Sequence, residues 1–153
     1  MKNFVFVLIL LLFIPLVSFG QDFDFNDLKG INSLKQFKKF SFEKEFIRTE
    51  ENDYIVTYAQ RYDKNKERAF IWAHYYPQAR SFEFQLVKNY DGTSSNSFNR
   101  TLEQVKSKCT FYDIRESDEK EFICYTCPGS AYLGKIGFAR GEKNDYIENF
   151  VNL

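Results

Sequence analysis

Three cysteines and a single histidine are the residues of this 153-residue chain with the clearest potential for chemistry. Cys124 and Cys127 form a Cys-x-x-Cys pair, the spacing of dithiol redox sites and of half a zinc site. The pair falls on an expected strand, whereas a reactive redox thiol sits at a helix N-terminus. Four zinc ligands would require all three thiols and His74, which lies in the other half of the chain. We therefore predict no metal site and no cofactor.

A structural disulfide is the simpler use of these thiols, because such bonds persist in oxidising compartments. If residues 117–120 form a hairpin loop, counting back along both strands places Thr110 opposite Cys127. Cys109, at the end of an expected helix, then lies next to Cys127. The sequence predicts a Cys109–Cys127 disulfide, with Cys109–Cys124 as the alternative connectivity and three free or buried thiols as the alternative to any bond. The remaining thiol would be a buried free cysteine, which behaves as a small hydrophobic residue.

Catalytic signatures are scarce. A Cys–His or Ser–His nucleophile pair would have to use His74, which sits among aromatic residues on an expected strand. The chain has no Gly-x-Ser-x-Gly nucleophile elbow and no glycine-rich phosphate loop. Its many carboxylates alternate with apolar residues, as solvent-facing strand positions do. We predict no catalytic residues, and an enzyme is the less favoured class.

Aromatic residues give the main indication of a binding site. Tyr54, Tyr58 and Tyr62 are four residues apart, so on a strand they share one face, and Trp72 and His74 share a face of the next strand. If helices cover the opposite side, these five rings form an exposed surface for a partner or ligand. In the alternative, the helices cover this face and the rings are core, because aromatic side chains dominate core burial.

The first twenty residues have the features of a cleaved signal peptide. Lys2 precedes an apolar run over 4–17, and small residues, Ser18 and Gly20, occupy the −3 and −1 positions before Gln21. The run is shorter than the roughly 20 residues that a bilayer needs. We predict a leader over 1–20 and a single exported domain over 21–153, secreted or periplasmic, with no membrane span after cleavage.

Composition limits the partners and the fold class. The 21 basic and 21 acidic residues balance, so nothing in the net charge favours nucleic acid. Aromatic residues make up 19% of the chain, which indicates a folded core and favours strands. The expected partner is another protein or a small ligand, and the oligomeric state stays open.

The hydrophobic spacing predicts two similar halves, about 21–90 and 91–153. A helix over about 26–40, interrupted at Gly30, precedes strands over 42–49, 53–60, 68–75 and 81–88. A second helix, capped by Ser97, precedes strands over 111–116, 121–127, 134–140 and 145–151. Consecutive strands with short loops pair antiparallel. We therefore predict an α+β domain of two helix-plus-four-strand units, with both helices on one face of the sheet. Internal duplication is one origin of this repeat, and the alternative is that the same order arose without duplication.

This order of elements is similar to that of some secreted inhibitor proteins, which grip their partners with a concave sheet. The similarity concerns element order alone. It favours a non-catalytic binding or inhibitor-like module. The alternatives are a small secreted hydrolase or thiol-dependent enzyme, and a structural envelope protein.

Overall fold

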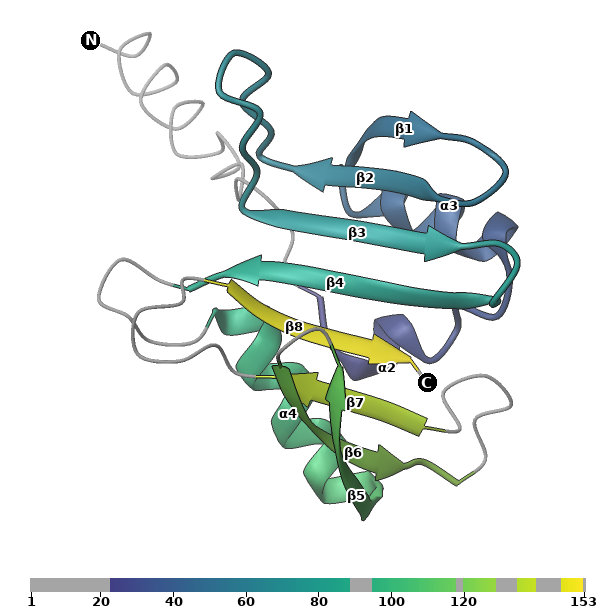
Figure 1. Cartoon of the computed structure of the whole chain (residues 1–153), viewed down its shortest axis with the longest axis vertical. Helices are drawn as coiled ribbons and strands as arrows, with labels where there is room; N and C mark the ends of the chain where they lie inside the picture. The colour runs from purple at the N-terminus through teal and green to yellow at the C-terminus, as the bar shows by residue number, and fades with distance from the viewer. Residues whose placement is uncertain (1–22, 89–94, 118–119, 129–134, 140–146, 153) are drawn as a thin grey trace, which may run out of the picture.

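The computed structural model describes residues 23–88, 95–117, 120–128, 135–139 and 147–152. Over these ranges the chain has an α+β fold built on an antiparallel sheet of eight strands (Figure 1). The predicted leader over 1–20 lies outside the described residues. None of the helices in the described ranges is long and apolar enough to cross a membrane.

Along the chain the elements follow the predicted order of helix, four strands, helix and four strands. The helices are α2 (Phe25–Leu28), α3 (Leu34–Glu43) and α4 (Asn96–Lys108). The strands are β1 (Ile47–Glu51), β2 (Val56–Gln60), β3 (Ile71–Tyr76), β4 (Ser81–Val87), β5 (Thr110–Ser117), β6 (Lys120–Thr126), β7 (Lys135–Ala139) and β8 (Ile147–Asn152).

The strand order in the sheet is β1-β2-β3-β4-β8-β7-β6-β5. Each group of four consecutive strands is a meander in which neighbours in sequence pair antiparallel. The two meanders meet where β4 pairs with β8, also antiparallel. In Figure 1 these two strands lie in the middle of the sheet. The strand order makes β1 and β5 its two edges.

The two longer helices contact the sheet through phenylalanine side chains. Phe37 of α3 lies 6.2 Å from Phe84 of β4, and Phe98 of α4 lies 5.7 Å from Phe138 of β7, measured between ring centroids. Phe84 and Phe138 both pair with Phe150, so the two rings lie on the same side of the sheet. We call this side the core face and the opposite side the open face.

The helix boundaries differ from the predicted ones in two places. α4 is capped by Ser95, whose hydroxyl accepts the Phe98 N–H, so the predicted cap at Ser97 is wrong. Ser97 is inside the helix and buried. The predicted strand over 42–49 begins too early, because α3 continues to Glu43 and Glu45 takes a positive φ of 60° before β1 starts. The expected break near Gly30 is present, between α2 and α3.

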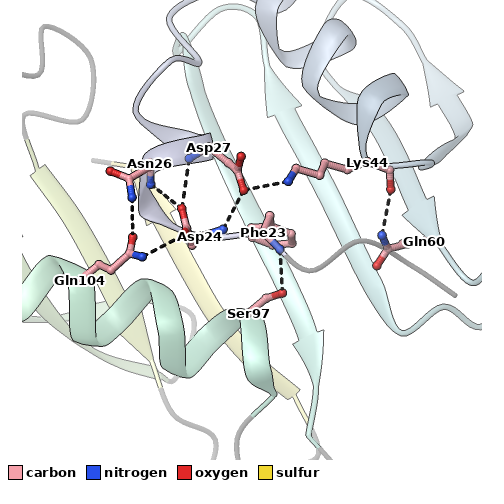
Figure 2. Close-up of polar contacts among 8 residues, drawn as sticks. All are labelled: Phe23, Asp24, Asn26, Asp27, Lys44, Gln60, Ser97 and Gln104. Carbon is pink, nitrogen blue, oxygen red and sulfur yellow. Dashed lines mark hydrogen bonds and ion pairs between the residues drawn. The ribbon is translucent and has the colours of Figure 1, made fainter. Parts of the chain in front are cut away.

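The segment that opens the described chain ties the two halves together (Figure 2). Phe23 is fully buried, and its backbone N–H donates to the Ser97 hydroxyl of α4 at 3.2 Å. Asp24 caps α2 and accepts a 2.8 Å hydrogen bond from the Gln104 side chain of α4. Asp27 forms a 2.9 Å ion pair with Lys44, which follows α3. These contacts fix α2 against both longer helices.

Candidate functional site

The open face of β2, β3 and β4 carries a row of polar side chains. His74 in the middle strand pairs with Thr57 on one side and with Glu83 on the other. Glu50 of β1 pairs with Thr57 and extends the row to the edge of the sheet. Directly opposed residues in antiparallel strands have Cβ atoms about 5 Å apart, so these four side chains are neighbours on one surface.

A second row, led by the only tryptophan of the chain, lies beside the first. Trp72 pairs with Ala59 and with Gln85. Its ring stacks with the His74 ring at a centroid distance of 6.4 Å and meets the Tyr62 ring edge-on at 5.5 Å. Trp72 and His74 are both half-buried, so part of each ring is accessible.

Hydrogen bonds hold these side chains in place. The Thr57 hydroxyl oxygen and Nδ1 of His74 share a hydrogen bond of 3.1 Å. The Tyr76 hydroxyl donates to Glu83 at 3.1 Å, and the Gln85 amide donates to the other Glu83 oxygen at 3.3 Å. The carboxylate is therefore oriented from two sides. We call these residues the open-face cluster: Thr57, Tyr62, Trp72, His74, Tyr76, Glu83 and Gln85.

Burial determines the charge state of His74. Desolvation lowers the pKa of the imidazole below its ordinary value, although the nearby carboxylates of Glu83 and Glu50 act in the opposite direction. At neutral pH the ring is therefore uncharged and has one donor and one acceptor nitrogen. The open-face cluster is then net negative because of its carboxylate.

The lowered pKa predicts that acid destabilises the fold before the carboxylates titrate. Between the folded pKa of His74 and the unfolded value of about 6.5, the unfolded chain binds more protons than the folded chain. The stabilisation is therefore complete above about pH 6.5 and is lost as the pH falls below that value. We expect urea unfolding at about pH 7.5, 6.5 and 5.5 to show this loss in the natural protein. His74→Gln should show a flatter profile, and equal slopes for both proteins would contradict the assignment.

Two of the predicted binding residues do not join this cluster. Tyr58 is only 8% exposed and lies on the core face, where its ring meets Phe37 at 5.9 Å. Its placement beside Trp72 on one exposed face was wrong, because the antiparallel register pairs Tyr58 with Ala73. Tyr54 precedes β2 and is 71% exposed, outside the regular alternation.

Tyr62 contacts Trp72, but its position does not follow from the two-residue alternation of a strand. Arg61 has a positive φ of 52°, a left-handed conformation that ends the alternation of β2 after Gln60. The expectation that Tyr62 and Trp72 lie together was therefore correct, although the face shared with Tyr58 was not.

Four members of the open-face cluster were not among the predicted site residues: Thr57, Tyr76, Glu83 and Gln85. The available signal was the strict alternation of β3 and β4, in which every second residue is half-buried. A hairpin between Tyr76 and Ser81 puts Glu83 and Gln85 on the same face as Trp72. Counting residues across this hairpin would have identified Glu83 and Gln85 as neighbours of His74 and Trp72.

The cysteines have the predicted structural arrangement. A disulfide joins Cys109, at the end of α4, to Cys127, just after β6. The predicted facing of Thr110 with Cys127 is wrong by one residue, because a bulge between Phe111 and Asp113 pairs Thr110 with Thr126. The bulge advances the register by one, which brings the disulfide pair directly opposite each other.

Cys124 is not suited to thiol chemistry. It is fully buried, and its Sγ donates to the Phe122 carbonyl at 3.4 Å. Burial raises the pKa of the thiol, so the nucleophilic thiolate is disfavoured. Within the described residues no group of three or more His, Cys, Asp or Glu side chains could hold a metal ion.

The hydrogen-bonded Thr57–His74 pair could suggest a nucleophile and its base. Thr57 is only 4% exposed, so a substrate would have little access to its hydroxyl. The accessible part of the cluster consists of rings, one carboxylate and one amide group, which recognise and orient other molecules. The geometry therefore favours binding over nucleophilic catalysis.

No protein-family model, curated protein or solved structure matches this chain.

Proposed function

We propose that this protein is an exported, non-catalytic binding module that contacts a partner protein through the open-face cluster. The proposal rests on one observation: half-buried aromatic rings and a doubly hydrogen-bonded carboxylate lie together on the open face of three neighbouring strands. Tyrosine and tryptophan are enriched at interfaces because they combine apolar area with a polar group.

The chemistry of the cluster favours a basic side chain on the partner. The Trp72 ring attracts a guanidinium or ammonium group through its π-face. Glu83 provides a carboxylate whose orientation is fixed by Tyr76 and Gln85. Arginine matches both features, since its planar fork stacks on rings and pairs with carboxylates. Glu50, in the same row, adds negative charge beside the cluster.

A peptide selection tests this function directly. A displayed random-peptide library would be selected against the immobilised protein, and enriched peptides are expected to contain arginine or lysine. Binding of a synthetic enriched peptide is then followed by the fluorescence of Trp72, the sole tryptophan. Glu83→Gln should weaken that binding about tenfold to hundredfold, because a charge-assisted contact contributes about 1.5–3 kcal/mol. The folds of both proteins are compared by circular dichroism.

Glu121→Gln is the matched control. Glu121 is an exposed carboxylate in β6, in alternation with Ile123, which pairs with Phe138 of the core face. Its removal changes the net charge equally and should leave peptide affinity unchanged. The proposal is contradicted when enriched peptides bind the Glu83→Gln and natural proteins equally, or when the Glu121→Gln protein loses the same affinity.

The other classes have less support. A small secreted hydrolase would use Thr57 and His74, but the threonine is buried, and a thiol-dependent enzyme would need a thiolate at the buried Cys124. An envelope structural protein would not require the interlinked polar groups of the open face. The Cys109–Cys127 disulfide is compatible with a secreted or periplasmic protein that has lost a leader over 1–20.

We further propose that the domain arose by duplication of a helix-plus-four-strand unit, with α3 and α4 packed on the core face. The palindromic strand order supports this origin, since a two-fold axis between β4 and β8 would exchange the two meanders. The same symmetry exchanges β3 with β7, and it relates the contact of Phe37 of α3 with Tyr75 of β3, at 5.3 Å, to that of Phe98 of α4 with Phe138 of β7, at 5.7 Å. A relative that contains one unit is then expected to dimerise through its fourth strand.

A further inference from the structure

A row of apolar side chains on the core face extends to the β5 edge of the sheet. On the core face, Phe138 of β7 pairs with Ile123 of β6, which pairs with Ile114 of the edge strand β5. Their exposed fractions rise from 3% to 42% to 53% toward the edge. α4 covers the inner end of this row through Phe98 and leaves a cavity of about 200 Å³ beside Ile123. The row therefore ends in two exposed isoleucines.

The two edges of the sheet differ. β1 has five residues, and its Glu51 forms ion pairs with Arg48 and with Lys38 of α3, features that discourage pairing with another strand. β5 has eight residues, is exposed over 110–116 and carries three large exposed hydrophobic side chains. Among the described strands, only β6 pairs with β5. An edge of this kind is a template for a further strand.

The pairing of β5 with β6 shows which backbone groups point outward. Ser117 pairs with Lys120 across a two-residue connection, so this closing pair is hydrogen-bonded and the pairs then alternate. The pairs of Ile114 with Ile123 and of Glu116 with Glu121 are therefore non-hydrogen-bonded. Consequently, the N–H and C=O groups of Ile114 and Glu116 point away from β6, toward the free edge, where the Ile114 N–H donates to the Asp113 carboxylate at 2.9 Å.

The charges of β5 select its partner. In a two-fold antiparallel pair the central residue faces its own copy. Centring on Asp113, Arg115 or Glu116 would bring like charges together, which is unfavourable. Centring on Ile114 places two isoleucines together on the core face and puts Asp113 of each copy opposite Arg115 of the other. Within one chain these two side chains already lie 3.6 Å apart.

We propose that the protein self-associates into a two-fold dimer in which β5 pairs with β5 of a second copy, centred on Ile114. The Ile114 N–H then exchanges the Asp113 carboxylate of its own chain for the Ile114 carbonyl across the axis, which leaves Asp113 to pair with Arg115 of the second copy, and the two apolar rows become one. The bulge after Phe111 confines the pairing to the segment from Asp113 onward, so the interface is small. Small interfaces of this size class give transient complexes.

The dimer has a consequence for binding. β5 is at the opposite edge of the sheet from β1, so the open-face clusters of the two copies lie at the far ends of one continuous sheet. Two-fold symmetry about an axis perpendicular to the sheet leaves both clusters on the same side. A partner with repeated basic sites would be bound at both ends, which raises its apparent affinity.

Sedimentation equilibrium of the purified exported protein tests the proposal, over concentrations from about 1 to 500 μM, which span dissociation constants of transient complexes. The natural protein is expected to show a monomer–dimer equilibrium. Asp113→Arg and Arg115→Asp each replace two opposite-charge pairs with like-charge pairs and should weaken the dimer about tenfold to hundredfold. The double variant Asp113→Arg/Arg115→Asp restores both pairs and should return the dissociation constant to near its natural value.

Ile114→Lys and Ile47→Lys form a matched pair of controls, because both isoleucines are similarly exposed, at 53% and 58%, on opposite edge strands. Ile114→Lys should leave only monomer, and Ile47→Lys should leave the equilibrium unchanged. A natural protein that is monomeric throughout the concentration range overturns the proposal. So does a dimer that persists in Ile114→Lys, one that is lost in Ile47→Lys, or a double variant no tighter than the single ones.

Discussion

Replacing Phe84 with alanine is expected to lower the free energy of unfolding by about 3–5 kcal/mol, the range for removal of a fully buried phenylalanine. Phe84 has no exposed surface and lies in the central strand β4. Its ring is 5.0–6.4 Å from other phenylalanine rings contributed by both ends of the first half: Phe23, Phe37, Phe40, Phe46 and Phe82. Truncation leaves a cavity that these rings cannot fill without leaving their rotamers.

Urea unfolding followed by Trp72 fluorescence measures this loss, and an unchanged m-value shows that only stability changed. Phe42→Ala is the matched control, since Phe42 is 83% exposed, and it should change the unfolding free energy by less than about 0.5 kcal/mol. A loss below about 1 kcal/mol for Phe84→Ala would mean that this residue is not in the core, because core truncations cost more.

Removing the disulfide is expected to cost about 3 kcal/mol, because the bond closes a loop with a sequence separation of 18 residues. In the unfolded chain the bond restricts the ends of that loop, and its loss releases conformational entropy. The bond also joins the end of α4 to the end of β6, so its loss frees the segment that leads into the edge strand.

The measurement compares guanidinium unfolding of the natural protein with that of Cys109→Ala/Cys127→Ala, each with and without a phosphine reductant. The reductant should destabilise the natural protein and leave the double variant unchanged, because Cys124 takes no part in the bond. Because the double variant keeps only Cys124, the pairing itself is tested by Cys124→Ala: this variant should keep the reductant sensitivity, and its loss would place Cys124 in the bond.

The strand pattern was predictable because alternation and turn residues are local signals. The four strands of the second half were expected within two residues of their observed bounds. The bulge after Phe111 was not expected. In a bulge two residues of one strand face one residue of the other, and this does not change the spacing of apolar residues along the sequence. The disulfide prediction was correct despite this error, because the one-residue shift moved Cys109 together with Thr110 and left Cys109 opposite Cys127.

The helix boundaries were harder to predict because helix and strand spacings overlap where apolar residues are dense. Phe42 was expected to begin the strand over 42–49, directly after the helix over about 26–40. In the structure Phe40 is buried with Phe37 on the helical spacing of α3, and Phe42 faces solvent. Both Ser95 and Ser97 are acceptable cap residues, and tertiary contact with Phe23 decides between them.

Half of the candidate site depended on information that is not local. Trp72 and His74 were recognised because their residue types and spacing stand out on one strand. The carboxylate of Glu83 joins them through the β3–β4 register, and Tyr58 was misplaced because the same spacing fits either face of a strand. The contact of Phe37 with Phe84 joins residues far apart in the sequence, so the spacing within one strand cannot reveal it.

The position of β8 has a consequence for how the chain reaches its final state. The last of the described strands in chain order inserts between β4 and β7, in the middle of the sheet. The ribosome extends the chain from its N-terminus. The free edge of β4 in the first meander therefore stays exposed until the final strand emerges. Completion is therefore a late, non-local event, and such pairing slows folding. An interrupted chain that lacks β8 would present two unpaired inner strands to its surroundings and is the form most prone to capture by chaperones or to aggregation.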